Sequence, residues 1–538
     1  MTDTTSAPEV AADDKLDKRT MAIAWVVVIG SIMAILDATI VNVAINKLAA
    51  EFDSTLATIQ WVVTGYMLAL ATVIPLTGWA IHRFGTKRLY IISLGLFMAG
   101  SALAGLAWSD TSLIVFRVLQ GLGGGMIMPA GMTLLTQAAG PSRVGRVMAI
   151  VGVPMMIGPI CGPILGGWLV DDFSWRWIFM VNVPVGVFAI YLAQRILPSD
   201  TPDGAQKLDV LGLLLLSPGL ASLIYGLAKM AEHSGFETTD SIVTSILGAV
   251  LVLAFVVHAL RKEDDPLLDL RLFGRRSVAA ASIAMTLFTF AFVGAMLLLP
   301  LYFQVVRHES ALMSGLLLAP QGIGAMLAMP FGGVLTDRYG PGRFVLGGIA
   351  VIVGTFLYLT QLAPDTSYWT LSAVLFVMGV AMGFTMMPMM TAAIQTLTHS
   401  EVPRASTALN IIQQVGGAVG TAILSVILAT ELTDRLAPAA AAAGAPAGSG
   451  GEAEGLAALQ AIPAELFGEL APAISDAFGA TMWWAVAFLV ASIVPALFLP
   501  MRKPALPDPA LLSEDDPRIG SDDDPDDDGV VPPPMLMH

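Results

Sequence analysis

Charged residues are scarce in this chain. Asp, Glu, Lys and Arg make up 13% of its 538 residues, against roughly 25% in an average soluble domain. Apolar residues reach 56%, and the mean hydropathy is +0.75. Such a chain needs lipid, and not water, around most of its helix faces. The composition predicts an all-α protein that crosses a membrane many times.

The sequence also lacks the motifs of common enzymes and metal sites. Its single cysteine, Cys161, excludes an intramolecular disulfide and a cysteine-based metal site. The six histidines show no metal-ligand spacing, and there is no Walker A loop, Gly-x-Ser-x-Gly elbow or His-Glu-x-x-His motif. We therefore expect neither catalysis nor a cofactor. The expected driving force is a proton gradient, in which one charge moved across 100 mV is worth about 2.3 kcal/mol.

The net charge of −15 is concentrated at the C-terminus. Residues 501–538 hold ten Asp and Glu residues and many prolines. This composition is typical of a disordered acidic tail on the cytoplasmic side, and it carries little information about a substrate. No basic face suggests nucleic-acid binding.

Runs of about 20 apolar residues, separated by charges and turn residues, predict the membrane spans. Residues 1–20 are polar and contain no apolar run, so we expect no cleavable signal peptide, and a first helix that stays as an anchor. The expected spans are fourteen: 21–45, 58–81, 89–107, 112–137, 144–169, 176–197, 208–230, 242–260, 278–303, 312–335, 343–362, 368–397, 406–430 and 480–500.

Lys and Arg predict the orientation. With both termini in the cytoplasm, 21 of these residues fall in cytoplasmic segments and five in external ones, with Arg117 inside a span. By the positive-inside rule, both ends are expected in the cytoplasm, in the plasma membrane.

The longest expected external segment is 431–479. Its first part, 438–451, is of low complexity, and its second part, 456–478, has apolar residues at helical intervals. The second part fits an amphipathic helix on the outer membrane surface, or equally a loop helix packed on the bundle. This segment could also meet a partner in the cell envelope.

Two loops reveal an internal repeat. Both follow the frame Gly-x-x-x-(His or Asp)-Arg-aromatic-Gly, 255 residues apart. The repeat predicts two six-helix halves, 21–197 and 278–500, joined by two extra central helices in 198–277. The loops are interpreted as gates between helix ends, or alternatively as plain topology determinants. Their residues are Gly78, His82, Arg83, Gly85 and Arg88 in the first half, and Gly333, Asp337, Arg338 and Gly340 in the second.

Asp37 and Arg117 are the two charges expected well inside the first half. Asp37 lies eight residues from the outer end of its span, about 12 Å deep, and Arg117 five residues from the outer end of its own, about 8 Å deep. An ion pair would lower the cost of burying both, and protonation of Asp37 would break it. This pattern predicts a proton switch. The alternatives are a headgroup-level acid and a snorkelling arginine.

These residues stand in motifs that resemble the major facilitator superfamily, and within it the 14-span drug:proton antiporter-2 family (EmrB/QacA type). The resemblance covers roughly residues 20–500. It rests on residues 36–44 in the first span, the loop 78–88, residues 117–121, residues 158–167, residues 175–184 and residues 301–304. It implies that Asp37 and Arg117 couple proton entry to export. Two departures are His82, where the family has aspartate, and Asn46, where it has proline.

The motif in the fifth expected span fits the family's antiporter motif. Small residues there would let a second helix approach closely, and prolines would kink the span. A close, kinked packing suits a seal against proton leak, although generic tight packing explains it equally well. The motif residues are Gly158, Gly162, Pro163, Gly166 and Gly167.

The substrate path can be predicted only as a group of residues. Methionines cluster in the expected central spans, and they suit promiscuous apolar surfaces. Polar residues that look buried in the spans could line the path: Gln60, Trp61, Gln304, Gln395, Asn410, Gln413 and Gln414.

These patterns favour a proton-coupled exporter of lipophilic or cationic compounds that works by alternating access. The expected partners are a lipophilic small molecule, protons and membrane lipids, and the protein is expected to be a monomer. Two alternatives stay open, an exporter of lipids or of a self-made metabolite, and a membrane sensor or structural protein without transport.

Overall fold

The structure is a computed structural model. It describes residues 17–139, 143, 146–147, 158, 161–162, 164–170, 172–199, 207–232, 239–262, 266–397, 401–442 and 464–502. These residues form long helices, because a chain in lipid must satisfy its backbone hydrogen bonds within itself. The expected acidic tail, residues 1–16 and Pro163 lie outside the described residues.

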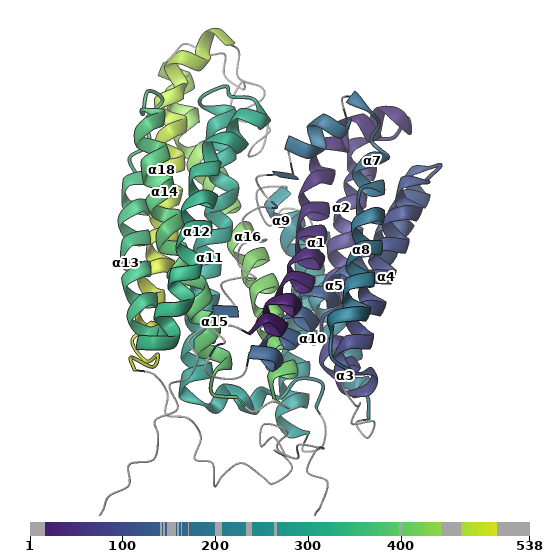
Figure 1. The fold of residues 1–538 in the computed structure, drawn as a ribbon. Helices are drawn as coiled ribbons and strands as arrows, with labels where there is room; N and C mark the ends of the chain where they lie inside the picture. The colour runs from purple at the N-terminus through teal and green to yellow at the C-terminus, as the bar shows by residue number, and fades with distance from the viewer. Residues whose placement is uncertain are drawn as a thin grey trace, which may run out of the picture. The chain divides into compact units, whose positions relative to one another are not determined.

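The N-terminal half forms one helical bundle (Figure 1). Its helices are α1 (Lys18–Glu51), α2 (Leu56–Val73), α3 (Leu76–Phe84), α4 (Thr86–Gly105), α5 (Asp110–Ala139), α7 (Trp177–Met180) and α8 (Asn182–Ile196). Helices α2 and α3 meet at an angle of 57°, and together they are long and apolar enough for one broken span. The bend falls at Pro75, which cannot continue the backbone ladder.

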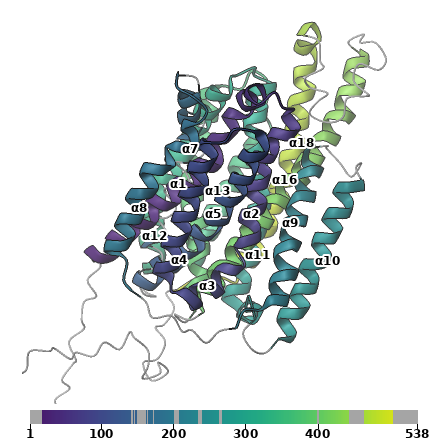
Figure 2. The same ribbon diagram turned by 90° about the vertical axis from the view of Figure 1, so that its right-hand side faces the viewer.

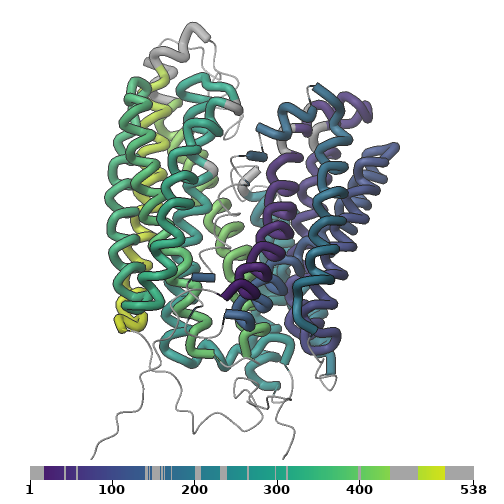
Figure 3. Tube along the Cα trace, viewed as in Figure 1, coloured from purple at the N-terminus to yellow at the C-terminus, as the bar shows by residue number. Residues whose placement is uncertain are grey.

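The C-terminal half forms a second bundle, visible as the teal, green and yellow helices on the left of the Cα trace (Figure 3). Its helices are α11 (Arg276–Val305), α12 (Ala311–Tyr339), α13 (Pro341–Leu359), α14 (Tyr368–Gly383), α15 (Met386–Ile394), α16 (Val402–Ala442) and α18 (Ala464–Ala496).

Helix packing repeats between the two halves. In the first half, α2 packs along α5, α4 along α8, and α1 along α8. In the second half, the corresponding pairs are α12 with α14, α13 with α18, and α11 with α18. The described helices therefore follow one packing plan in both halves, as the repeated loops predict.

The repeated loops share one backbone conformation. Gly85 has φ 83° and ψ 151°, and Gly340 has φ 89° and ψ 151°. Each donates its N–H to a carbonyl four residues earlier, on Ile81 at 2.8 Å and on Thr336 at 2.9 Å. Only glycine adopts such a conformation without strain, which explains why both loops carry glycine at this position.

Two extra helices, α9 (Val210–Glu232) and α10 (Thr239–Arg261), lie side by side between the halves in sequence (Figure 2). Helix α9 packs on α2 of the first half and on α16 of the second. Ser217 on α9 donates to the carbonyl of Thr72 on α2 at 2.6 Å. The extra helices therefore contact both halves.

Asp209 links the N-terminal end of α9 to the C-terminal end of α10. Its carboxylate accepts from His258 and Lys262 at 3.0 Å, and from the backbone N–H of Gly212 at 3.0 Å and of Leu267 at 3.3 Å. Burial alone would raise the pKa of Asp209, but these donors together lower it to about 2.

Within the described residues, 12 helices are long and apolar enough to cross a membrane, and the bent pair α2–α3 adds one more. The expected span 144–169 lies mostly outside the described residues, so the structure does not test it as a span. Each of the other thirteen expected spans coincides with one of these helices.

For the segment 456–478, the structure confirms the alternative of a helix packed on the bundle, where it describes the segment, and contradicts a helix on the membrane surface. Helix α18 runs without a break from Ala464 into the last span, and Leu470, Ile474 and Phe478 are buried in the main apolar core. Helix α16 likewise continues to Ala442, well past the predicted membrane end at 430. The apolar spacing belongs to a packed helix end, and residues 443–463 lie outside the described part.

Candidate functional site

Asp37 lies in the middle of the first bundle, on α1, and only 1% of its surface is exposed. Its carboxylate accepts from three side chains. Arg117 Nη1 lies 2.5 Å from Oδ2, and Gln120 Nε2 and Asn182 Nδ2 each lie 2.8 Å from Oδ1. Three helices, α1, α5 and α8, thus meet at one carboxylate.

Arg117 is buried completely and uses several further contacts. Its Nη1 donates to Gln120 Oε1 at 2.7 Å, and its Nε donates to the carbonyl of Val62 at 3.2 Å. The guanidinium carbon lies 4.1 Å from the centre of the Tyr66 ring. Val62 and Tyr66 belong to α2, so the arginine ties a fourth helix to the site.

A hydrogen-bonded chain continues from Asp37 across α8 to α4 and α7. Asn182 Nδ2 also lies 3.0 Å from Ser101 Oγ, and Ser101 donates to the carbonyl of Phe179 at 2.9 Å. Asp37, Asn182, Ser101 and Phe179, which form this series of hydrogen bonds, are all buried. A buried network of this kind fixes the orientation of each member, because an unpaired group would be costly.

This geometry gives Asp37 two chemically distinct states. As a carboxylate, it balances the positive charge of Arg117. Once protonated, it loses that attraction, while Arg117 keeps Gln120, Val62 and Tyr66 as partners. Because burying an unpaired charge is costly, loss of the Asp37 charge would weaken this helix junction.

Sequence reasoning placed Asp37 and Arg117 at comparable depth, and the structure brings them into contact. It did not assign Gln120, Asn182 or Ser101 to the site. Gln120 and Asn182 stand in the family-like motifs, and a polar residue three positions after an intramembrane arginine shares its helix face. That spacing was the available signal for Gln120.

The antiporter motif packs directly against α1, beside Asp37. A Cβ on Gly158 would lie 2.2 Å from Ile35 Cγ2, and one on Gly162 would lie 2.1 Å from Thr39 Oγ1. Thr39 also donates to the carbonyl of Gly158 at 3.1 Å. These glycines permit the helix contact that the motif predicts. Gly166 is buried.

Gly167 departs from that expectation. A Cβ there would meet no atom within 4 Å, so this glycine is not needed for close packing against the described residues.

Both repeated loops contact the opposite half. Asp337 accepts from the backbone N–H of Arg146 at 3.2 Å and lies 3.7 Å from its Nε. In the first half, a Cβ on Gly78 would lie 3.6 Å from Thr407 Oγ1 and 3.7 Å from the Cα of Arg404. The loops therefore hold one end of the two halves together, instead of joining only neighbouring helices of one half.

The other loop residues differ in exposure. Arg83, Arg88 and Arg338 are exposed, whereas His82 and Gly333 are buried. The Arg338 guanidinium lies 5.3 Å from the Tyr339 ring centre.

Three of the expected path residues are not buried. Gln60, Trp61 and Gln304 are exposed, and Trp61 stacks on Tyr225 of the extra helix α9 at 5.6 Å between ring centres. The prediction of burial is wrong for these three residues. A residue near the end of a span, or against an added helix, has the same local sequence pattern as a residue in the core.

The remaining path residues are partly buried. Gln413 contacts Met285 Sδ at 3.6 Å, and Asn410 donates to the carbonyl of Ser406 at 2.8 Å. Gln414 lines a small apolar cavity between α2, α9 and α16. Gln395 Nε2 is buried without a hydrogen-bond partner among the described residues.

Sequence reasoning missed one further glutamine. Gln321 on α12 is buried, its Nε2 contacts Met296 Sδ at 3.3 Å, and its Oε1 has no hydrogen-bond partner among the described residues. A glutamine directly after a proline in the middle of a span was the signal.

Comparison with known proteins identifies the family. The family model of the Major Facilitator Superfamily matches residues 27–421. A multidrug resistance protein B homolog of Mycobacterium tuberculosis (strain ATCC 25618 / H37Rv) is 43% identical over 91% of this chain and 92% of its own length. The multidrug export protein EmrB of Escherichia coli (strain K12) is 30% identical, over 73% of this chain and 77% of its own.

A solved structure shares the fold. The human organic anion transporter MFSD10 (TETRAN) superposes with a TM-score of 0.56 at 14% identity, covering 87% of this chain and 99% of that one. The doubled bundle, the membrane-length helices and these relatives lead to one conclusion. The chain is a multi-pass membrane protein that belongs to the Major Facilitator Superfamily, among its multidrug efflux transporters.

Proposed function

We propose that this protein exports lipophilic compounds, cationic ones included, from the cytoplasm in exchange for protons. The observation that carries the proposal is the buried Asp37 carboxylate, held by donors from three side chains on two other helices. An ionisable group so deep in a membrane bundle is costly, and its usual reason is function.

Proton binding at Asp37 would act on the helix junction around it. Neutralising the carboxylate removes the attraction between α1 and α5, while Arg117 stays tied to α2 through Val62 and Tyr66. Thr39, two residues beyond Asp37, contacts Gly158 and Gly162 of the antiporter motif. A proton therefore biases how α1 packs on both sides.

The contact between Asp337 and Arg146 is the proposed gate. It joins the two halves at the end where most Lys and Arg residues lie, which we assign to the cytoplasm. Opening the binding site to the cytoplasm requires this contact to break. The proposed orientation places both termini on that side of the plasma membrane.

The named activities of the relatives suggest the substrate class, because they are multidrug resistance and multidrug export proteins. Buried methionines on α15, among them Met387, Met389 and Met390, offer adaptable apolar surface. Few buried charges would interact with a transported compound. Among the described residues, the buried Asp, Glu, Lys and Arg side chains are Asp37, Arg117 and Asp209.

A substrate panel in reconstituted vesicles tests the proposal. The purified protein is placed in vesicles with an imposed pH gradient, and the uptake of cationic dyes, neutral lipophilic drugs and a labelled lipid is measured. We expect gradient-dependent transport of dyes and drugs. Transport of the labelled lipid alone would favour the alternative, a lipid exporter. No transport of any probe would contradict both.

A further inference from the structure

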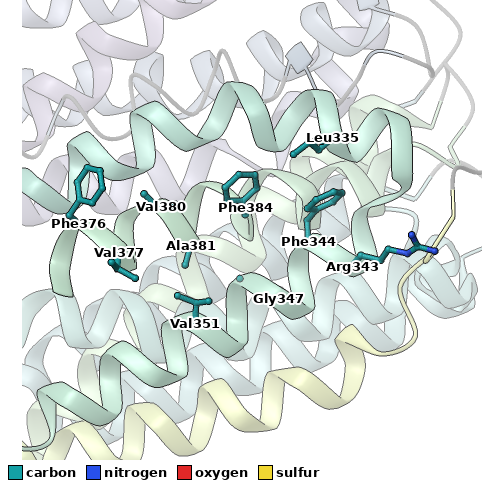
Figure 4. A pocket seen from close by; sticks show the side chains of 11 residues that line it. Leu335, Arg343, Phe344, Gly347, Val351, Phe376, Val377, Val380, Ala381 and Phe384 are labelled. Carbon is teal, nitrogen blue, oxygen red and sulfur yellow. The ribbon is translucent and has the colours of Figure 1, made fainter. Parts of the chain in front are cut away.

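A groove of about 600 Å³ lies on the C-terminal bundle between α12, α13 and α14 (Figure 4). Its walls are almost entirely apolar, with Phe344 and Val351 on α13, Phe376 on α14, and Phe384 directly after α14. The volume is in the range of small-molecule sites, roughly 300–1,000 Å³. The groove therefore has the size and the lining of a binding site.

This groove faces away from the helix junction at Asp37. Helix α13 packs against α12, α14, α15 and α18, all in its own bundle. Val351 and Val377, which line the groove, are each 45% exposed. Since α12, α13 and α14 all belong to segments long and apolar enough to span the membrane, the groove opens toward lipid.

Two neighbouring glycines create the groove. A Cβ on Gly348 would lie 2.1 Å from Thr385 Oγ1, so this glycine lets α13 approach the following helices. A Cβ on Gly347 would meet no atom within 4 Å, so this glycine leaves space at the surface. The repeat places Ile92, which is 48% exposed, at the position equivalent to Gly347. The first half thus carries a branched side chain where the second half is hollow.

One end of the groove is positively charged. Arg343, in the first turn of α13, lines it, and Figure 4 shows the guanidinium extending past the apolar side chains. The backbone of Arg502 lies against Gly340, three residues before Arg343. The described residues that line the groove include no acid. An apolar channel with a basic end matches an amphiphile with an acyl chain and an anionic head.

We propose that this groove binds an anionic phospholipid, with an acyl chain along Phe344 and Phe376 and the phosphate at Arg343. The membrane supplies such lipids at high concentration to any groove that opens on it, and one basic residue favours an anionic head. By the proposed orientation, the head lies in the cytoplasmic leaflet.

Lipid retention measured by native mass spectrometry tests this proposal. The full-length protein is reconstituted in phosphatidylcholine nanodiscs with and without phosphatidylglycerol, released, and its bound lipids are counted. We expect the wild type to retain phosphatidylglycerol in preference to phosphatidylcholine. Gly347→Ile fills the groove and should abolish this retention. Arg343→Gln should lower the preference about fivefold, the equivalent of ~1 kcal/mol for one basic residue at an anionic surface.

Two matched variants serve as controls. Arg88→Gln removes the arginine equivalent to Arg343 in the first half, and Gly354→Ile adds a side chain on α13 at another glycine with open space around it. Both should retain phosphatidylglycerol as the wild type does. Equal retention of the two lipids by the wild type, or equal losses in Arg343→Gln and Arg88→Gln, would overturn the proposal.

The groove could instead hold the exported compound, and the same variants decide this. Gly347→Ile is assayed for export in vesicles of phosphatidylcholine alone. Lost export together with unchanged phosphatidylglycerol retention would overturn the lipid site. Lost retention with export preserved supports it, whether or not the proposed proton coupling is correct.

Discussion

Replacing Gly162 by alanine tests the contact between the antiporter motif and α1. The added Cβ would lie 2.1 Å from Thr39 Oγ1 and 2.7 Å from Thr39 Cβ, where ordinary contacts begin near 3.4 Å. A change of the Thr39 rotamer would move Oγ1 but not Cβ, so one helix must move by roughly 0.5–1 Å. Overpacking of this kind typically costs about 1–3 kcal/mol.

The assay compares Gly162→Ala with Gly167→Ala, which lies in the same motif but has open space for a Cβ. We expect Gly162→Ala to lower the thermal unfolding midpoint in detergent and to reduce dye efflux from cells, and Gly167→Ala to do neither. Adding Thr39→Gly removes both clashing atoms. The destabilisation of the double variant should therefore be smaller than the sum for the two single variants, by roughly 0.5–3 kcal/mol. Equal behaviour of the two alanine variants would refute the described packing.

Three further predictions concern the loops and the extra helices. Gly85→Ala and Gly340→Ala should each destabilise the protein by about 1–3 kcal/mol, because both glycines combine a positive φ with an extended ψ; unchanged unfolding midpoints would contradict this. Asp337→Asn should weaken the contact with Arg146 and increase cysteine labelling from the cytoplasmic side, and unaltered labelling would argue against a gate. Asp209 has a pKa of about 2 in the folded protein and 3.8 unfolded, so its stabilisation should be complete above about pH 4 and fade as the pH falls toward 2. Asp209→Asn should remove this part of the acid sensitivity, and an identical acid-unfolding curve would refute it.

Much of the architecture could be predicted from the sequence, because lipid imposes strong rules on it. Long apolar runs predicted the spans, and the repeated loop predicted two halves of one plan. The shared turn of Gly85 and Gly340 shows why the repeat was visible, since both positions demand the same residue for the same backbone reason.

The central ion pair could be anticipated, but its surroundings could not. Depth along a helix follows from counting residues, so Asp37 and Arg117 could be placed at similar levels. Rotation about the helix axes and the choice of neighbouring helices depend on packing of the whole bundle. Asn182, 145 residues from Asp37, could not be assigned to the carboxylate by counting.

Other failures share one physical cause. Apolar spacing is the same for a helix on a membrane surface and for a helix end packed in a bundle, so the spacing of residues 464–478 could not decide between these two alternatives. Polarity along a lipid-facing or an extra helix resembles polarity along a path, so Trp61 was expected inside and instead stacks on Tyr225.

Proton movement through the Asp37→Asn variant is the most direct test of the account. Wild-type protein in vesicles that contain a pH-sensitive dye should move protons when a substrate gradient is imposed. The Asp37→Asn variant should bind and exchange substrate but move no protons. Asp209 is another buried carboxylate, and the Asp209→Asn variant should move protons as the wild type does. Substrate-driven proton movement by Asp37→Asn at the wild-type rate would contradict the central claim.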